Sequence, residues 1–222
     1  MMTDSAVSMM LMLAAASVLP FILAAGTCYL KFSIVFVMVR NALGVQQVPS
    51  NMVLNAIAFI LAMVVMFPLV SKTYAYINEN PVELSQPESL SRFTDEGLQD
   101  YRDYLFRYAD KPLLYFFAQT DVDEDAEPEL SDARDIAFFP LLAAYALGEI
   151  KSAFLISFYL YLPFIVIDLV VSSVLLALAL GMMMMSPVTL SVPIKLILFI
   201  ALDGWSLLST SLVSQYLELM DI

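Results

Sequence analysis

The sequence contains no histidine and only one cysteine, Cys28. Histidine is the commonest acid–base catalyst near neutral pH and the commonest metal ligand, so its absence argues against both kinds of site. A single cysteine excludes an intramolecular disulfide and a zinc site built from the cysteines of this chain. Because Cys28 lies within an apolar run, we interpret it as a small buried side chain.

Charge is also scarce, and it is unevenly distributed. Charged residues make up 14% of the chain and hydrophobic residues 61%, whereas a soluble domain has about 25% and about 45–50%. The stretch from Lys72 to Asp135 holds 16 of the 22 acidic residues and 6 of the 10 basic ones. The remainder is nearly neutral and offers no basic patch for nucleic acid. The composition therefore predicts a membrane protein with an acidic polar insert.

Motifs of catalysis and cofactor binding are missing as well. The sequence has no glycine-rich phosphate loop, no nucleophile elbow, no HExxH and no CxxC. Asp121, Asp123 and Asp125 have the spacing that opens a calcium-binding loop, but Ala126 stands where that loop requires glycine. We interpret this stretch as a solvated acidic loop, and we expect no metal, no cofactor and no enzymatic activity.

The N-terminal part is dominated by two apolar segments. Residues 5–30 carry no charge, and no basic residue precedes them as in an ordinary cleaved leader, so we expect a retained helical segment, with an unusual cleaved leader as the alternative. Residues 41–51 contain Gly44 and Pro49 and predict a loop, with Asn51 as the N-cap of the next helix. Residues 52–70 then give 19 mostly apolar positions, which is long enough to span a bilayer.

The polar insert has one helical signature. Leu98, Tyr101, Leu105 and Tyr108 recur at helical spacing and predict an amphipathic helix. Residues 120–135 are rich in acids and lack periodicity, which predicts a flexible loop. Lys31 and Arg40 would lie in a short cytoplasmic loop under the positive-inside rule, so we expect a periplasmic insert.

The C-terminal part predicts a helical hairpin. Residues 152–186 contain a single charge, Asp168, and residues 188–212 are again apolar. The first stretch ends in a break, flanked by Gly181 and Pro187, that contains four consecutive methionines. The predicted organisation is an all-α membrane protein with N-terminal helical segments (1–70, with a polar break at 41–51), an acidic insert (71–150) and a C-terminal hairpin (151–222).

Two charges within the hairpin need partners, because a charge exposed to lipid costs about 2.5–3.5 kcal/mol. We expect Asp168 and Lys195 to form ion pairs between helices or subunits. Counted from the methionine break at about 1.5 Å per residue, the two would differ in height by roughly 9 Å. Asp203 lies eight positions after Lys195, about 12 Å along a helix. Because neither Asp168 nor Asp203 of the same chain is expected to lie level with Lys195, we favour Glu149 of a neighbouring copy that is shifted along the hairpin axis as its partner.

The methionine run itself has two interpretations. Met182, Met183, Met184 and Met185 cannot share one face of a helix. Methionine is flexible and polarizable, so several copies of this run could form a deformable apolar seal at a constriction. The alternative is ordinary membrane core.

Three stretches of the sequence are distinctive: FILAAGTCYLKFSIVFVMVRNALGVQQVPSN (Phe21 to Asn51), LLAAYALGEIKSAF (Leu141 to Phe154) and YLPFIVIDLVVSSVLLALALGMMMMSPVTLSVPIKLILFIALDGW (Tyr161 to Trp205). Together they resemble the FliP/SctR family of core export-gate proteins from bacterial flagella and type III secretion systems. The KFSIVFVMVRNALG wording is more similar to the injectisome branch than to the flagellar one. The acidic loop at 120–135 matches no family motif.

The resemblance implies a function and partners that composition does not show. A member of this family is an inner-membrane protein that forms a pentamer and joins two other small membrane proteins. The assembly contacts larger export-gate subunits and the needle or inner rod, and it conducts unfolded secreted proteins. The methionine run would then be the gasket of the closed pore, and the apolar segments could be buried in the assembly rather than in lipid.

Two other classes of function stay open on the residues alone. One is an ion- or proton-coupled transporter subunit that uses Asp168 at a midplane site. The other is an intramembrane aspartyl protease with Asp168 and Asp203 as its dyad, which the missing nucleophile–base pairs nearly exclude. Ring stoichiometry and pore size would discriminate the gate from the transporter.

Overall fold

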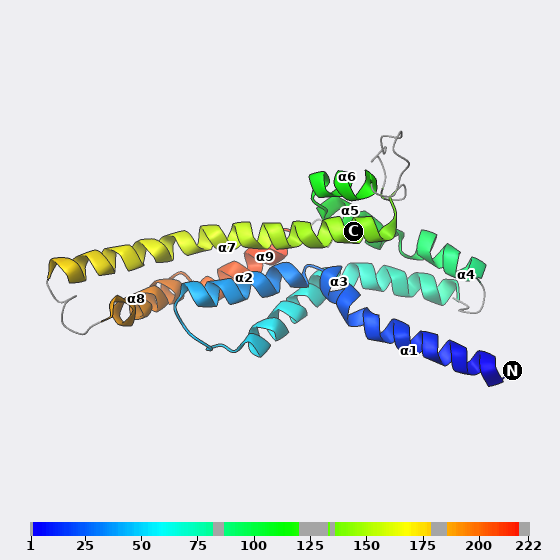
Figure 1. Cartoon of the computed structure of the whole chain (residues 1–222), viewed down its shortest axis with the longest axis horizontal. Coiled ribbons are helices and arrows are strands. Elements are labelled where there is room, and N and C mark those ends of the chain that lie inside the picture. Colours follow the sequence, from blue (N-terminus) through cyan, green and yellow to red (C-terminus); the bar gives the residue numbers. More distant parts are fainter. Residues whose placement is uncertain (1, 82–86, 120–132, 134–135, 179–185, 218–222) are drawn as a thin grey trace. The chain divides into compact units, whose positions relative to one another are not determined.

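The computed structural model describes residues 2–81, 87–119, 133, 136–178 and 186–217. Every regular element within these residues is a helix, which confirms the all-α prediction. In chain order they are α1 (Met2–Ala25), α2 (Tyr29–Ala42), α3 (Asn51–Glu79), α4 (Pro87–Arg92), the π-helical η1 (Phe93–Gly97), α5 (Gln99–Tyr108), α6 (Lys111–Gln119), α7 (Phe138–Ala177), α8 (Pro187–Ala201) and α9 (Gly204–Ser214) (Figure 1).

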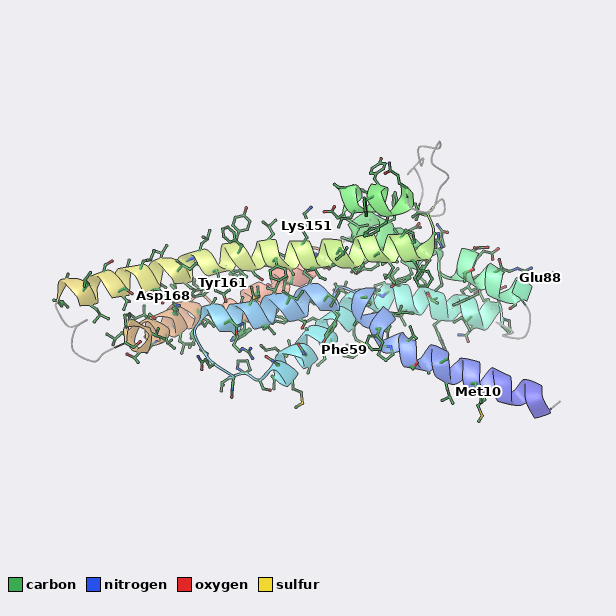
Figure 2. All side chains as sticks on the ribbon, viewed as in Figure 1. Met10, Phe59, Glu88, Lys151, Tyr161 and Asp168 are labelled. Carbon is green, nitrogen blue, oxygen red and sulfur yellow. The ribbon has the colours of Figure 1, made fainter. Side chains whose placement is uncertain are left out.

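Two of these helices, α3 and α7, are long and apolar enough to cross a membrane, and the number rises to four if each of two bent helix pairs forms one span. At about 1.5 Å per residue, the 40 residues of α7 measure about 60 Å, twice the hydrocarbon thickness of a bilayer. Apolar side chains project from this helix along its length (Figure 2), and Leu169 and Leu176 are 62% and 74% exposed. The helix therefore exposes large apolar side chains that lipid or partner subunits would cover.

Contacts divide the chain into two compact units. The first comprises Met1–Leu30 and Asn80–Glu149, and the second comprises Lys31–Glu79 and Ile150–Ile222. Helix α7 begins at Phe138, within the stretch assigned to the insert from the sequence, and its first twelve residues belong to the first unit.

The first unit is built around α5 and the beginning of α7. The predicted amphipathic helix is present as α5, and its residue Leu105 is fully buried. Leu114 of α6 and Leu141 of α7 are also fully buried. Arg102 of α5 donates to the main-chain oxygens of Ala133 and Ile136, which fixes the chain just before α7 begins.

The expected single segment 5–30 was wrong, because the helix ends at Ala25 and a new one begins at Tyr29. Thr27 Oγ1 accepts a hydrogen bond from the Tyr29 amide, in the manner of a helix cap, although at 3.3 Å. A Cβ on Gly26 would lie 2.0 Å from the Tyr101 hydroxyl oxygen, so this break needs glycine for the close approach of α5.

The second unit packs α2, α3, α8 and α9 with the rest of α7. On α2 the buried residues Phe32, Val35, Phe36 and Val39 recur at spacings of three and four, as one helical face requires. On α3 the buried face consists of Leu54, Ala58, Ala62, Val65, Met66 and Leu69. Ser33 Oγ donates to Asn55 Oδ1 across these helices at 2.7 Å.

The predicted loop at 41–51 is present, with two differences in detail. Ser50, and not Asn51, is the N-cap of α3, because its Oγ accepts from the Val53 amide at 3.4 Å. Lys31 and Arg40 do not lie in a loop as expected, but near the two ends of α2, and both are buried. The expected periplasmic orientation of the insert rested on a short charged loop that the structure does not contain between Lys31 and Arg40. This orientation therefore stays a prediction.

The apolar segment 188–212 is also divided. Helix α8 ends at Ala201, α9 begins at Gly204, and the two are bent by 59°. Asp203 has a left-handed backbone at the bend, with φ of 49°. The Phe199 ring lies where a Cβ of Gly204 would be and also contacts the Trp205 ring edge-on at 5.2 Å, so this bend is packed by aromatic side chains.

Candidate functional site

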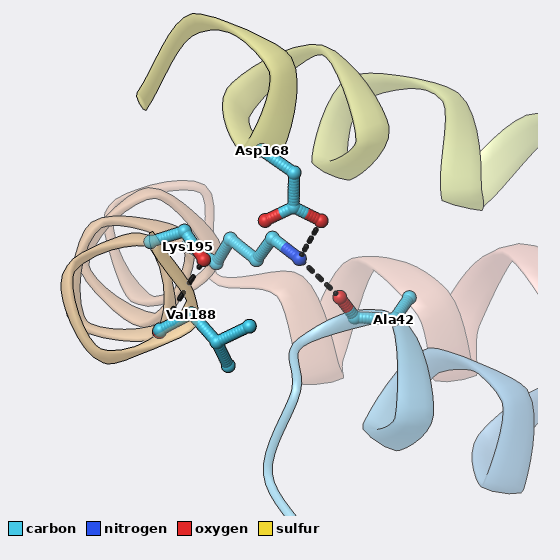
Figure 3. A network of polar contacts seen from close by, with 5 residues as sticks. Ala42, Asp168, Val188 and Lys195 are labelled. Atoms are coloured by element: carbon cyan, nitrogen blue, oxygen red, sulfur yellow. Dashed lines mark hydrogen bonds and ion pairs between the residues drawn. The ribbon is translucent and has the colours of Figure 1, made fainter. Parts of the chain in front are cut away.

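The charged network of the C-terminal hairpin lies where three helices of the second unit meet. Lys195 Nζ on α8 lies 2.6 Å from Asp168 Oδ2 on α7, and it donates to the main-chain oxygen of Ala42 at 3.0 Å (Figure 3). Ala42 is the last residue of α2. One ammonium therefore neutralises a carboxylate and satisfies a carbonyl at a helix C-terminus, where a cation is favourable.

The estimate that Asp168 and Lys195 differ in height by about 9 Å was wrong, because it counted from the methionine run. The relevant reference points are the ends of the helices. Asp168 lies nine residues before α7 ends at Ala177, and Lys195 lies eight residues after α8 begins at Pro187. The two side chains are therefore nearly level, and they meet within one chain.

Burial of the pair is unequal. Only 6% of the Lys195 side chain is exposed, compared with 45% of the Asp168 side chain. The ammonium is thus the desolvated member, and it needs both of its observed acceptors because a buried unpaired charge is costly. Asp168 keeps one face open to lipid, water or a neighbouring protein.

The turn that follows α2 packs against the same region of α8. Gly44 has φ of 75° and its amide donates to Asn41 O at 3.0 Å, which ends the helix in a left-handed turn. A Cβ added to Gly44 would lie 2.8 Å from Val192 Cγ2 on α8. The end of α2 is therefore joined to the hairpin by a charge and by close contact of its backbone.

The other end of α2 is held by the C-terminal part of the chain. Lys31 Nζ donates to the Tyr216 hydroxyl at 2.7 Å and lies 4.8 Å from the centre of its ring, while Gln215 Oε1 lies at 3.4 Å. Phe32 meets the same ring edge-on at 5.9 Å. Sequence reasoning missed this cluster because its partners are 185 positions apart.

Glu149 belongs to the first unit, where it is buried near a group of tyrosines. The Tyr104 and Tyr145 hydroxyls share a hydrogen bond, and Tyr101 donates to the main-chain oxygen of Gly26 at 2.9 Å. Burial raises the pKa of Tyr101 to about 12. Burial, with Cys28 and Glu149 nearby, raises the pKa of Tyr104 well above its ordinary value. Neutral tyrosines thus supply the buried polar contacts here.

The methionines of the predicted gasket, Met182 to Met185, lie outside the described residues, as does nearly all of the acidic loop at 120–135. Within the described part of the chain, no group of three or more acidic or cysteine side chains is placed to hold a metal ion.

Comparison with known proteins gives one consistent answer. Residues 12–212 match the model of the FliP family. "Surface presentation of antigens protein SpaP" from Salmonella typhi is 56% identical over 220 residues, covering 96% of this chain and 97% of that protein. "Yop proteins translocation protein R" from Yersinia pestis is 41% identical, covering 95% and 96% of the two chains, and "Harpin secretion protein HrcR" from Erwinia amylovora is 36% identical, covering 93% and 94%. The chain therefore belongs to the FliP/SctR family of export proteins, in the branch that serves type III secretion.

Proposed function

We propose that this protein is a pore-forming structural subunit of a type III secretion export gate in the bacterial inner membrane. Several copies, five by the family resemblance, would assemble with two other small membrane proteins and conduct unfolded proteins. The observation that carries this proposal is the similarity over nearly the whole chain to three proteins whose names refer to surface presentation, translocation and secretion. The exposed apolar length of α7, about twice a bilayer thickness, supports an assembly in which helices are covered by other subunits.

The pore would close at the hairpin tips. The Asp168–Lys195 pair fixes α7 against α8 nine residues before α7 ends and eight residues after α8 begins, so the two helices that flank Met182 to Met185 in the sequence are anchored to each other. A ring of such tips would bring flexible apolar side chains together in a seal. This role is structural, and energy for transport would come from other subunits.

Replacing Met182 to Met185 with alanine tests the seal. We expect small ions or metabolites to leak across the inner membrane while the complex still assembles on native gels. The matched control replaces Met10 and Met63, which are exposed on α1 and α3. Unchanged permeability in a correctly assembled quadruple variant would contradict the gasket.

The insert is proposed to face the periplasm. A cysteine at Ser89, in a Cys28→Ser background, should react with a membrane-impermeant thiol reagent in cells whose outer membrane has been permeabilised. Reaction only after the inner membrane is broken would reverse the orientation.

An additional pairing of Lys195 with Glu149 of a neighbouring copy stays a prediction beside the pair seen within the chain. The reversal Lys195→Glu should impair assembly and secretion. If Glu149→Lys in the same chain restores them, the neighbouring copy contributes the partner. If only Asp168→Lys restores them, the contact within the chain is sufficient.

A transporter that uses Asp168 is the less favoured function. Asp168 is bound by Lys195, so it is already neutralised, whereas an ion-coupling carboxylate has to exchange its cation. Asp168→Asn should therefore weaken assembly more than it changes any proton flux. Loss of proton-coupled uptake by intact complexes would favour the transporter instead.

A further inference from the structure

Arg40 is a buried cation for which the described part of the chain supplies no anion. It is 9% exposed and lies near the end of α2. Its Nη1 donates to the Pro49 main-chain oxygen at 3.1 Å, and its Nη2 donates to Asn41 Oδ1 at 3.3 Å. Both acceptors are neutral, and Nε is buried without a hydrogen-bond partner among the described atoms. The guanidinium has five N–H groups, so unused donors remain on both terminal nitrogens.

Asp203 is the complementary case in the same unit. It lies at the bend between α8 and α9, is exposed, and makes no side-chain cap hydrogen bond to the helix that follows. No hydrogen bond or ion pair of its carboxylate is found within the described residues. The start of α9 stabilises this negative charge in part, because helix N-termini carry a partial positive charge.

The surroundings of both residues are apolar. Val48 lies in the loop whose Pro49 carbonyl accepts a hydrogen bond from Arg40, and Met52 lies at the start of α3. These side chains are 69% and 79% exposed. Ile200 and Leu202, directly before Asp203, are 73% and 61% exposed. Each charge therefore lies beside a surface that is stable only when covered, and the two surfaces carry opposite charges.

We propose that Arg40 of one copy of this chain pairs with Asp203 of the next copy. The contact is heterologous, because each copy uses its Arg40 side toward one neighbour and its Asp203 side toward the other. Heterologous contacts generate closed rings or helical stacks. The carboxylate accepts from the unused N–H groups of the guanidinium in a charge-assisted, planar arrangement for which arginine is well suited.

A second copy accounts for these features better than a lipid phosphate does. Residues 41–71 contain no other lysine or arginine, and a phosphate site usually gathers more than one cation. One guanidinium matches one carboxylate in charge. A lipid also leaves Asp203 without a partner, whereas a second copy satisfies both residues at once.

The proposal rests on the multi-copy assembly proposed above, and cysteine cross-linking tests it. In a Cys28→Ser background, Arg40→Cys is placed on one tagged copy and Asp203→Cys on a differently tagged copy, and the two are expressed together and oxidised in membranes. We expect a covalent dimer that carries both tags. The control pairs Arg40→Cys with Glu79→Cys, an exposed acid at the end of α3, and should give no dimer.

A charge reversal gives an independent measurement, in case a cysteine at position 40 disturbs the loop. Arg40→Asp or Asp203→Arg alone should lower the yield of assembled complex by about tenfold or more, because each leaves two like charges in an apolar contact. The double reversal should recover most of the yield. Glu79→Arg should leave the yield unchanged.

The outcomes separate this inference from the proposed function. Assembled complexes without the two-tag dimer and without recovery in the double reversal overturn the Arg40–Asp203 contact alone. Release of bound anionic phospholipid by Arg40→Gln in native mass spectrometry would also overturn this contact. A wild-type chain that stays monomeric when its partner subunits are present overturns the proposed gate itself.

Discussion

The two units of this protein differ in the polar contacts formed by their buried groups. In the first, which also buries the acid Glu149, neutral hydroxyls make these contacts: Tyr104 and Tyr145 bond to each other, and Tyr101 bonds to a main-chain oxygen. The second uses ions: Lys195 binds Asp168 and a helix end, and Lys31 binds a tyrosine hydroxyl and ring. A neutral hydroxyl costs less to desolvate than an ion and adds modest stability when bonded, whereas a buried ion is costly once its partner is lost. The second unit should therefore be the more sensitive to single substitutions.

The largest expected effect is at Lys195. Lys195→Met leaves Asp168 and the Ala42 carbonyl without their cation. The free energy of unfolding of the second unit should fall by about 3 kcal/mol, at the low end for a buried pair because Asp168 is part exposed. Trp205 is the only tryptophan and lies in this unit, so its fluorescence reports the transition in denaturant. Lys195→Arg is the control and should lose less. Equal denaturant midpoints of unfolding for Lys195→Met and the wild type would mean that the second unit is not the more sensitive one.

Alkaline pH should weaken the first unit. Tyr101 has a pKa of about 12 in the folded chain and about 10 when unfolded. Below pH 10 both states keep the proton, and between pH 10 and 12 only the unfolded state loses it. Folding stability should therefore decline across this window, by about 2–3 kcal/mol when it is complete. The difference in tyrosinate absorbance between the wild type and Tyr101→Phe reports the ionisation of Tyr101, and its midpoint should lie near pH 12. A midpoint near pH 10 would mean that the Tyr101 hydroxyl is not desolvated.

A smaller effect is expected at Gly44, where the backbone is left-handed. Gly44→Ala should destabilise the second unit by about 1–2 kcal/mol through its positive φ, with a further loss from contact with Val192. The same substitution in a Val192→Ala background separates the two causes, because only the contact is relieved there. Full recovery in that background would show that backbone strain contributes nothing. Trp205 fluorescence in denaturant again measures the effect.

The smallest expected effect is at Tyr101. Tyr101→Phe removes one hydrogen bond to Gly26 O and keeps the ring, so it should cost about 1 kcal/mol. Hydrogen exchange should increase in peptides that cover α5 and the break after α1. Tyr115→Phe, at an exposed position on α6, should have no effect. A loss as large as that of Lys195→Met would mean that the first unit is as sensitive as the second.

Much of the architecture could be predicted from the sequence, because apolar runs and helical periodicity are local properties. Composition predicted an all-α membrane protein, the periodicity of Leu98, Tyr101 and Leu105 predicted α5, and Gly44 with Pro49 predicted the loop before α3. Family membership also followed from motifs read in order. The chain breaks within apolar runs, after Ala25 and at Asp203, were missed, because only one or two small or polar residues mark each of them.

Only the tertiary structure decided which charges meet. From the sequence, the distance between Asp168 and Lys195 depended on an assumed reference point, and a shift of a few residues changed the height by several ångströms. The observed ends of α7 and α8 bring the two side chains level, and the end of α2 adds a second contact to Lys195 from 153 positions away. Sequence determines that a lysine in an apolar segment needs a partner, since desolvation is costly wherever it occurs. Which partner it finds depends on where helices end and how they pack, and no local pattern specifies that.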